Sequence, residues 1–245
     1  MRFGDLTYEE IREAAAAGDL VVVPTGCTEQ QGPHLTVDFD TWFADSLCLA
    51  AADRALEEHG TNVLVLPALP FGPTSEHKSF GSGYIHVPTA LHREILRSIF
   101  QSVVEQGFSR ILIWRGCGGH DLQSLVDSFN CEQAGRAHAF LPPQPFHEVW
   151  SEIGNPAVPG GHADSFATSI ALYLRPACVR QSKIFDPNSG HVDWTDPELD
   201  FAEYSCSGVI GDPTLASADL GKRLWKRLVE IVAATFAEAA VTTAD

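Results

Sequence analysis

The chain has 245 residues, of which 44% are hydrophobic and 20% are charged, which is enough apolar material for a substantial core. Its net charge of −16, from 16 Lys and Arg against 32 Asp and Glu, repels phosphate backbones and anionic membranes. The charge therefore argues against nucleic acids as partners and favours a neutral or cationic small molecule.

The first third of the chain alternates predicted helices and buried strands. Thr7 begins a helix over 7–17, because Glu10 follows at the spacing of a capping box. The β-branched run at 19–24 predicts a buried strand, and residues 41–58 form an Ala-rich helix. Residues 61–67 read TNVLVLP and predict a second buried strand.

The middle third contains a long loop and a third strand. Residues 71–89 are rich in Gly, Ser, His and Pro, and they predict a functional loop with at most one short strand. An amphipathic helix at 89–106 is followed by a buried strand at 110–114. Residues 122–135 predict another helix, whereas 136–161 gives no clear pattern.

The last third predicts two helices, at 163–174 and 216–240, around an irregular segment at 180–215. Alternating buried strands and helices indicate a mostly parallel sheet covered on both faces, a three-layer α/β/α fold. Sites in such folds lie at the carboxyl ends of the strands, which here lead into loops 25–40 and 115–121.

Neither a signal peptide nor a membrane span is predicted, since no apolar run approaches roughly 20 residues. The six cysteines form no CxxC pair and stand at positions 27, 48, 117, 131, 178 and 206. We therefore expect a cytoplasmic protein with reduced thiols.

Five segments in order resemble the creatininase family of metal-dependent amidohydrolases. Residues 24–35 read PTGCTEQQGPHL and resemble P-x-G-S-x-E-Q-H-G-x-H-L. Residues 115–120 read RGCGGH where the family has N-G-H-G-G-N, and shorter matches lie at 80–83, 161–169 and 208–214. The resemblance implies one creatininase-like domain over residues 1–245, often assembled into hexamers.

The resemblance also implies a two-metal site, from which this chain departs. Glu29 and the bridging Asp40 are kept, while Cys117 replaces the histidine of the first metal. The histidine of the second metal is replaced by Gln31. The remaining carboxylate falls on Gly119 or Ala167, neither of which can bind a metal through its side chain.

Two chemistries remain open for this altered site. Glu29, Asp40 and Cys117 form a ligand set that suits a single zinc ion, since zinc accepts all three side-chain types. Alternatively, the site is metal-free and Cys117 is a nucleophile. A helix start just after it would lower its thiol pKa, with His120, His34 or His162 as base.

Several neighbouring side chains carry expectations of their own. Cys27 stands where the family has serine and is expected close to Cys117. The two could form a disulfide or a thiol pair for a soft metal ion, and the alternative is a replacement without consequence. Arg115 is expected to pair with Glu29 or Asp40. His34 is expected to make a structural hydrogen bond. Further predictions are pocket positions for His77 and Trp194, and burial as inert filler for the cysteines at 48, 131, 178 and 206.

Two functional hypotheses follow. The first is an enzyme acting on a C–N bond of a small amide or cyclic amide, either by hydrolysis or by a related acyl transfer or ring closure in a biosynthetic pathway. Its candidate catalytic residues are Cys117, Glu29, His162 and His120. The second is a non-catalytic member of the fold that binds a ligand or forms an assembly.

Overall fold

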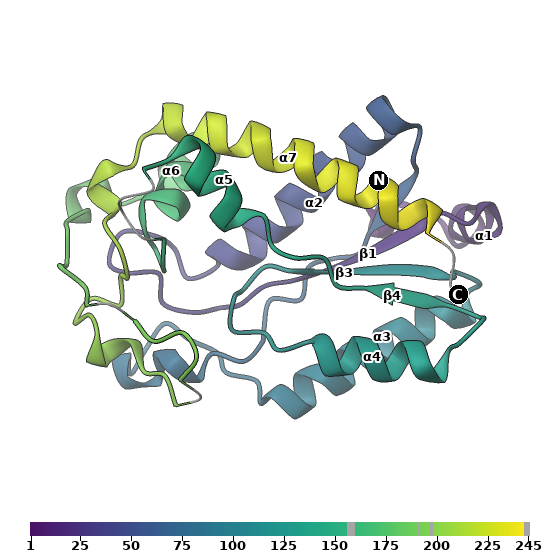
Figure 1. The fold of residues 1–245 in the computed structure, drawn as a ribbon, viewed down its shortest axis with the longest axis horizontal. Coiled ribbons are helices and arrows are strands. Elements are labelled where there is room, and N and C mark those ends of the chain that lie inside the picture. The colour runs from purple at the N-terminus through teal and green to yellow at the C-terminus, as the bar shows by residue number, and fades with distance from the viewer. Residues whose placement is uncertain (156–159, 191, 197, 243–245) are drawn as a thin grey trace.

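The computed structural model has a four-stranded parallel sheet at its centre, in the order β2-β1-β3-β4 (Figure 1). Its strands are β1 Leu20–Thr25, β2 Val63–Val65, β3 Arg110–Arg115 and β4 His138–Phe140. The residues that the structure describes are 1–155, 160–190, 192–196 and 198–242.

Helices cover both faces of the sheet, as the sequence predicts. Figure 1 shows α2, α5, α6 and α7 above the strands, with α3 and α4 below. The helices are α1 Tyr8–Ala17, α2 Phe39–His59, α3 Thr89–Glu105, α4 Gln123–Glu132, α5 Phe146–Ile153, α6 Ser165–Leu174 and α7 Ala218–Val241. The fold is thus a three-layer α/β/α arrangement.

Each strand supplies both core layers, because successive side chains of a strand point to opposite faces. Along β1, Leu20 and Val22 pack with α2 and α7, while Val21 and Val23 pack with α3. Burial on both faces explains the continuous β-branched run from which this strand was predicted.

The predicted cap of the first helix is confirmed, and two further helices also begin at capping side chains. Thr7 and Glu10 make both hydrogen bonds of a capping box at the start of α1. Asp164 and Ser217 cap α6 and α7 through their side chains. Among the described residues, no helix is both long and apolar enough to cross a membrane.

The structure differs from the sequence-based elements in three places. Helix α2 begins at Phe39, so Asp40 lies in its first turn and not in the preceding loop. The unassigned stretch 136–161 contains β4 and α5, apart from 156–159, which lie outside the described residues. The long loop 71–89 holds a 3-10 helix, Ser75–Phe80, and its only pairing in the described chain is a Gly72–His86 bridge.

The carboxyl ends of β1 and β3 bring the two expected loops together. Thr25 pairs in register with Arg115, and the N–H of Gly116 donates to the carbonyl of Thr25 at 2.8 Å. Both strands are therefore locked side by side at the point where the chain turns toward Glu29 and Cys117.

Candidate functional site

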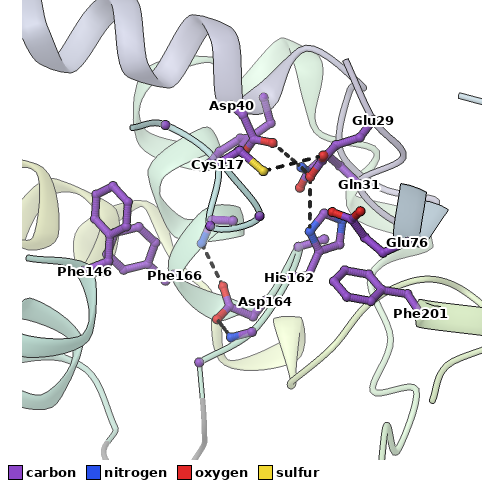
Figure 2. A pocket seen from close by; sticks show the side chains of 18 of the residues that line it. Glu29, Gln31, Asp40, Glu76, Cys117, Phe146, His162, Asp164, Phe166 and Phe201 are labelled. Atoms are coloured by element: carbon purple, nitrogen blue, oxygen red, sulfur yellow. Dashed lines mark hydrogen bonds and ion pairs between the residues drawn. The ribbon is translucent and has the colours of Figure 1, made fainter. Parts of the chain in front are cut away.

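A cavity of about 500 Å³ opens at the carboxyl edge of the sheet. One side is polar and is built from the loops after β1 and β3, the first turn of α2 and the 3-10 helix (Figure 2). Figure 2 shows Phe146 and Phe166 across the cavity from Glu29, and Phe201 beside His162. The aromatic side chains that line the cavity are Phe39, Phe43, Phe146, Trp150, Phe166, Trp194 and Phe201. The predicted pocket positions of His77 and Trp194 are confirmed.

Glu29, Asp40 and Cys117 converge at one point of the polar side. Their ligand atoms, with that of Cys27, all lie within 4.8 Å of one another. The Cys117 thiol points at Oε2 of Glu29 over 3.8 Å (Figure 2). The convergence expected from two separate loops is therefore present.

Glu29 and Asp40 are buried beside one another, and within the described part of the chain no lysine or arginine forms an ion pair with either of them. Burial raises the pKa of Glu29 to about 7, and burial together with the charge of Glu29 raises the pKa of Asp40 well above its ordinary value. Buried anions of this kind require a cation or a proton. The donors present, two carboxylates and a thiol, fit one zinc-class ion.

The expectation that Arg115 supplies the compensating charge is wrong. Its Nη1 donates to the carbonyl oxygen of His120 at 3.3 Å, and within the described chain no ion pair joins it to Glu29 or Asp40. Arg115 is the last residue of β3, and its guanidinium donates to a backbone carbonyl of the loop that follows the strand.

The second metal position of the family is closed by an amide. The NH₂ of Gln31 donates to Oε1 of Glu29 at 3.3 Å and to Oδ2 of Asp40 at 3.2 Å (Figure 2). A neutral donor thus holds the two carboxylates together where a cation would otherwise lie between them. At Gly119, an added Cβ would lie 3.1 Å from Oε1 of Glu76, so that carboxylate fills the space of the missing side chain. The residues present do not fit a second ion at this position.

A hydrogen-bond network fixes the protons of two histidines on the cavity wall. Gln30 accepts the N–H of Gly32 through Oε1, so its NH₂ faces Nδ1 of His77 at 2.9 Å. His77 therefore carries its proton on Nε2, which lies 3.4 Å from Glu29 and 3.7 Å from Glu76.

His162 has the opposite arrangement. Its Nε2 lies 2.7 Å from the carbonyl oxygen of Gln30 and must donate to it, which leaves Nδ1 unprotonated, 3.6 Å from Oε1 of Glu29. Burial lowers the pKa of His162 to about 3, so the ring is neutral. Helix α6 is capped by Asp164 and not by His162.

The expected activation of Cys117 is not present. Helix α4 starts at Gln123, too far along the chain to act on the thiol. A hydrogen bond from Cys27 lowers the pKa of Cys117, but burial and the charges of Glu29 and Asp40 outweigh it and raise the pKa to about 12. An isolated Cys117 nucleophile is therefore disfavoured.

His120 turns toward Cys27 and not toward Cys117. Its Nε2 lies 3.0 Å from the Cys27 sulfur, and its Nδ1 lies 3.2 Å from the hydroxyl of Thr25. Burial lowers the pKa of His120 to about 3. The ring is fully buried behind the cavity wall, so direct proton transfer to a bound substrate, one of its predicted roles, is not possible from this position.

The cysteines divide into three groups. Cys27 and Cys117 are close, as expected, and both are free thiols. Cys48 is buried in the core, which confirms its expected role as filler. That expectation is wrong for Cys131 and Cys206, which are exposed on the surface, and Cys178 is only partly buried.

Three other side chains support the site: one was predicted from the sequence and two were not. His34 makes the structural hydrogen bond expected of it, to the hydroxyl of Thr168 at 2.8 Å. Glu76 was not predicted, although it directly precedes His77 in a loop that the composition marked as functional. Gln30 was also missed, because its partner Gly208 is 178 residues away in sequence.

Buried carboxylate and thiol donors at the carboxyl edge of an α/β/α sheet form a candidate metal-binding site of an α/β enzyme. The family model for creatininase, creatinine amidohydrolase, matches residues 4–236, and the chain belongs to this family.

Relatives and solved structures agree with this assignment. The chain is 30% identical over 217 residues to the mycofactocin precursor peptide peptidase of Mycolicibacterium smegmatis, covering 86% of this chain and 81% of the relative. It is 27% identical to the creatinine amidohydrolase of Pseudomonas putida, covering 90% and 88%. A solved structure described as "Creatininase Mn" superposes with a TM-score of 0.81 at 21% identity, covering 98% of this chain and 99% of that one.

Proposed function

We propose that this protein hydrolyses the C–N bond of an amide with a single zinc-class ion held by Glu29, Asp40 and Cys117. The observation that carries the proposal is the convergence of these three buried donors at the cavity wall. Two curated relatives are a peptidase and an amidohydrolase, so cleavage of a C–N bond is the chemistry that the family favours.

A zinc ion bound there would polarise the amide carbonyl and lower the pKa of a bound water to about 7. The protein's own groups have separate tasks. His162 presents an unprotonated Nδ1 to the cavity and accepts a proton beside Glu29. Nε2 of His77 lies 3.4 Å from Glu29 and 3.7 Å from Glu76 and has no hydrogen-bond partner among the described residues, so its N–H is free for a bound substrate.

The cavity wall restricts the substrate. No lysine or arginine lines the cavity among the described residues, and Glu76 adds a carboxylate to it. A substrate with its own carboxylate would therefore be repelled. The aromatic side and a volume of about 500 Å³ suit a neutral or cationic amide with an apolar or aromatic group, larger than creatinine. A short peptide segment has these properties.

The experiment combines metal analysis with hydrolysis. Protein purified without added metal is analysed for bound zinc, then assayed against creatinine and short peptides with aromatic, aliphatic or acidic side chains. We expect about one ion per chain and cleavage of the aromatic peptides. Glu29→Gln should abolish cleavage, while the surface variant Cys131→Ser, in helix α4, should leave it unchanged.

Cleavage that survives both a chelator and Glu29→Gln would refute the metal-dependent reaction. A protein that binds these peptides without cleaving them would instead support the ligand-binding alternative. A cytoplasmic location and a hexameric assembly stay predictions from the sequence.

A further inference from the structure

Three positions that depart from the family pattern quoted above meet at one place behind the cavity wall. They are Cys27, in place of serine, Cys117, in place of histidine, and His120, in place of asparagine. They come from two loops, yet their ligand atoms all lie within 4.8 Å of one another. Unrelated substitutions would not be expected to assemble two thiols and an imidazole.

The imidazole of His120 is already set for metal binding. The hydroxyl of Thr25 donates to the carbonyl of Trp114 at 3.3 Å, so its oxygen accepts the proton on Nδ1 of His120. Nε2 is then unprotonated and points at the sulfur of Cys27. Histidines that bind metals commonly donate their other N–H to such a neighbour, which fixes the ring and its tautomer.

The thiols share this location with the two carboxylates. Cys27, Glu29, Asp40 and Cys117 also lie within 4.8 Å of one another, so the Cys27–Cys117 pair belongs to both clusters. Cys27 and His120 are fully buried, and Cys117 alone of the three lines the cavity. An ion bound between the sulfurs would have soft donors behind it and carboxylate oxygens on its cavity side.

We propose that Cys27, Cys117 and His120 bind the metal ion, and that an oxygen of Glu29 or Asp40 completes its coordination. This inference rests on the proposed single-ion function: it adds Cys27 and His120 to the ligands and keeps Cys117 with one of the two carboxylates. Binding requires both thiols to lose their protons to solvent as the divalent ion enters. Two thiolates and an imidazole select zinc over manganese and magnesium, which prefer oxygen donors.

The test is metal binding by the whole protein, without any substrate. Metal-free protein is titrated with Co²⁺, whose thiolate charge-transfer absorption in the near ultraviolet grows with the number of bound thiolates. Competition with Zn²⁺ and Mn²⁺ then gives relative affinities. We expect one ion, two thiolates, displacement of cobalt by zinc and no displacement by equimolar manganese.

Variants separate ligands from supporting residues. Cys27→Ser should halve the charge-transfer absorption, and His120→Asn should shift it. Each should weaken Zn²⁺ binding by more than the roughly 10–100-fold that loss of a supporting hydrogen bond costs. Thr25→Val, which removes only such a bond, should fall within that range of about 10–100-fold. Cys131→Ser is the matched control on the surface.

Circular dichroism and unfolding of the metal-free variants check that each is folded, with Cys27→Ala and His120→Gln as second variants. Unchanged zinc affinity and an unchanged cobalt spectrum in folded Cys27 and His120 variants would overturn the proposed ligand set. Peptide cleavage measured on the same samples separates the two proposals. If the protein cleaves peptides but the Cys27 and His120 variants bind metal normally, the proposed hydrolase stands and the proposed ligand set fails. If the protein binds an ion through two thiolates but cleaves no peptide, the ligand set stands and the hydrolase fails.

Discussion

Replacing Gly116 by alanine should separate the two strands that position the site. A Cβ at this residue would press against the carbonyl oxygen of Thr25 and lie 2.8 Å from Cβ of Ala44. Backbone and a packed helix cannot both give way without moving β1 from β3. Overpacking costs about 1–3 kcal/mol, and loss of the Gly116 N–H to Thr25 hydrogen bond adds roughly 1 kcal/mol. We expect a loss of about 2–4 kcal/mol in the free energy of unfolding.

Gly118 offers the matched control, because it lies in the same loop and a Cβ there would meet nothing within 4 Å. Gly118→Ala should change stability by less than about 1 kcal/mol. Urea unfolding followed by circular dichroism measures both variants. Gly116→Ala should also lower the midpoint temperature by roughly 4–16 °C, from about 2–4 °C per kcal/mol in a chain of this size. Equal stabilities for the two variants would refute the argument from close backbone approach.

Three further predictions concern stability, each measured by urea unfolding. Thr7→Ala removes the capping box of α1 and should cost about 0.5–2 kcal/mol, so an unchanged midpoint would contradict the cap. Phe100→Ala should cost about 3–5 kcal/mol because its ring is fully buried against Phe129, whereas the exposed Leu91→Ala on the same helix should cost under about 0.5 kcal/mol. Burial lowers the pKa of His34 from 6.5 to about 4, so the unfolded chain binds a proton first as the pH falls. Stability should therefore decline between pH 6.5 and about 4, and His34→Gln should flatten that decline; an identical slope in the variant would remove His34 as its cause.

Much of the architecture could be predicted from local sequence. The run Leu20–Thr25 is buried on both faces of the sheet, which is why its β-branched pattern predicted a strand. Strand β4 could not be predicted in this way, because His138–Phe140 has only three residues and exists through its pairing with β3. The same reasoning explains α5, whose short apolar face is fixed by packing on α7.

The site was predictable only in part, for a related physical reason. Glu29, Asp40 and Cys117 could be placed together because the carboxyl ends of parallel strands meet at one edge. The ring of His120 could not be placed, since its orientation depends on Thr25, 95 residues earlier. Gln30 determines the tautomer of His77 through a contact across 47 residues. The spacing of residues along the sequence does not indicate which distant side chains will form such hydrogen bonds.

The rim of the cavity and its polar floor are built from different kinds of structure. The polar side is built on the sheet and on α2, whereas Trp194, Leu199 and Phe201 lie in a segment whose described residues form short turns and 3-10 helices and pack through a small hydrophobic cluster. Trp194 and Leu199 belong to no strand and to no group of proposed metal donors, whereas Phe201 also packs on His77 and His162. Substrate range and metal binding therefore depend on different parts of the fold, so substitutions at Trp194 and Leu199 can change which substrate enters while the donor residues stay the same.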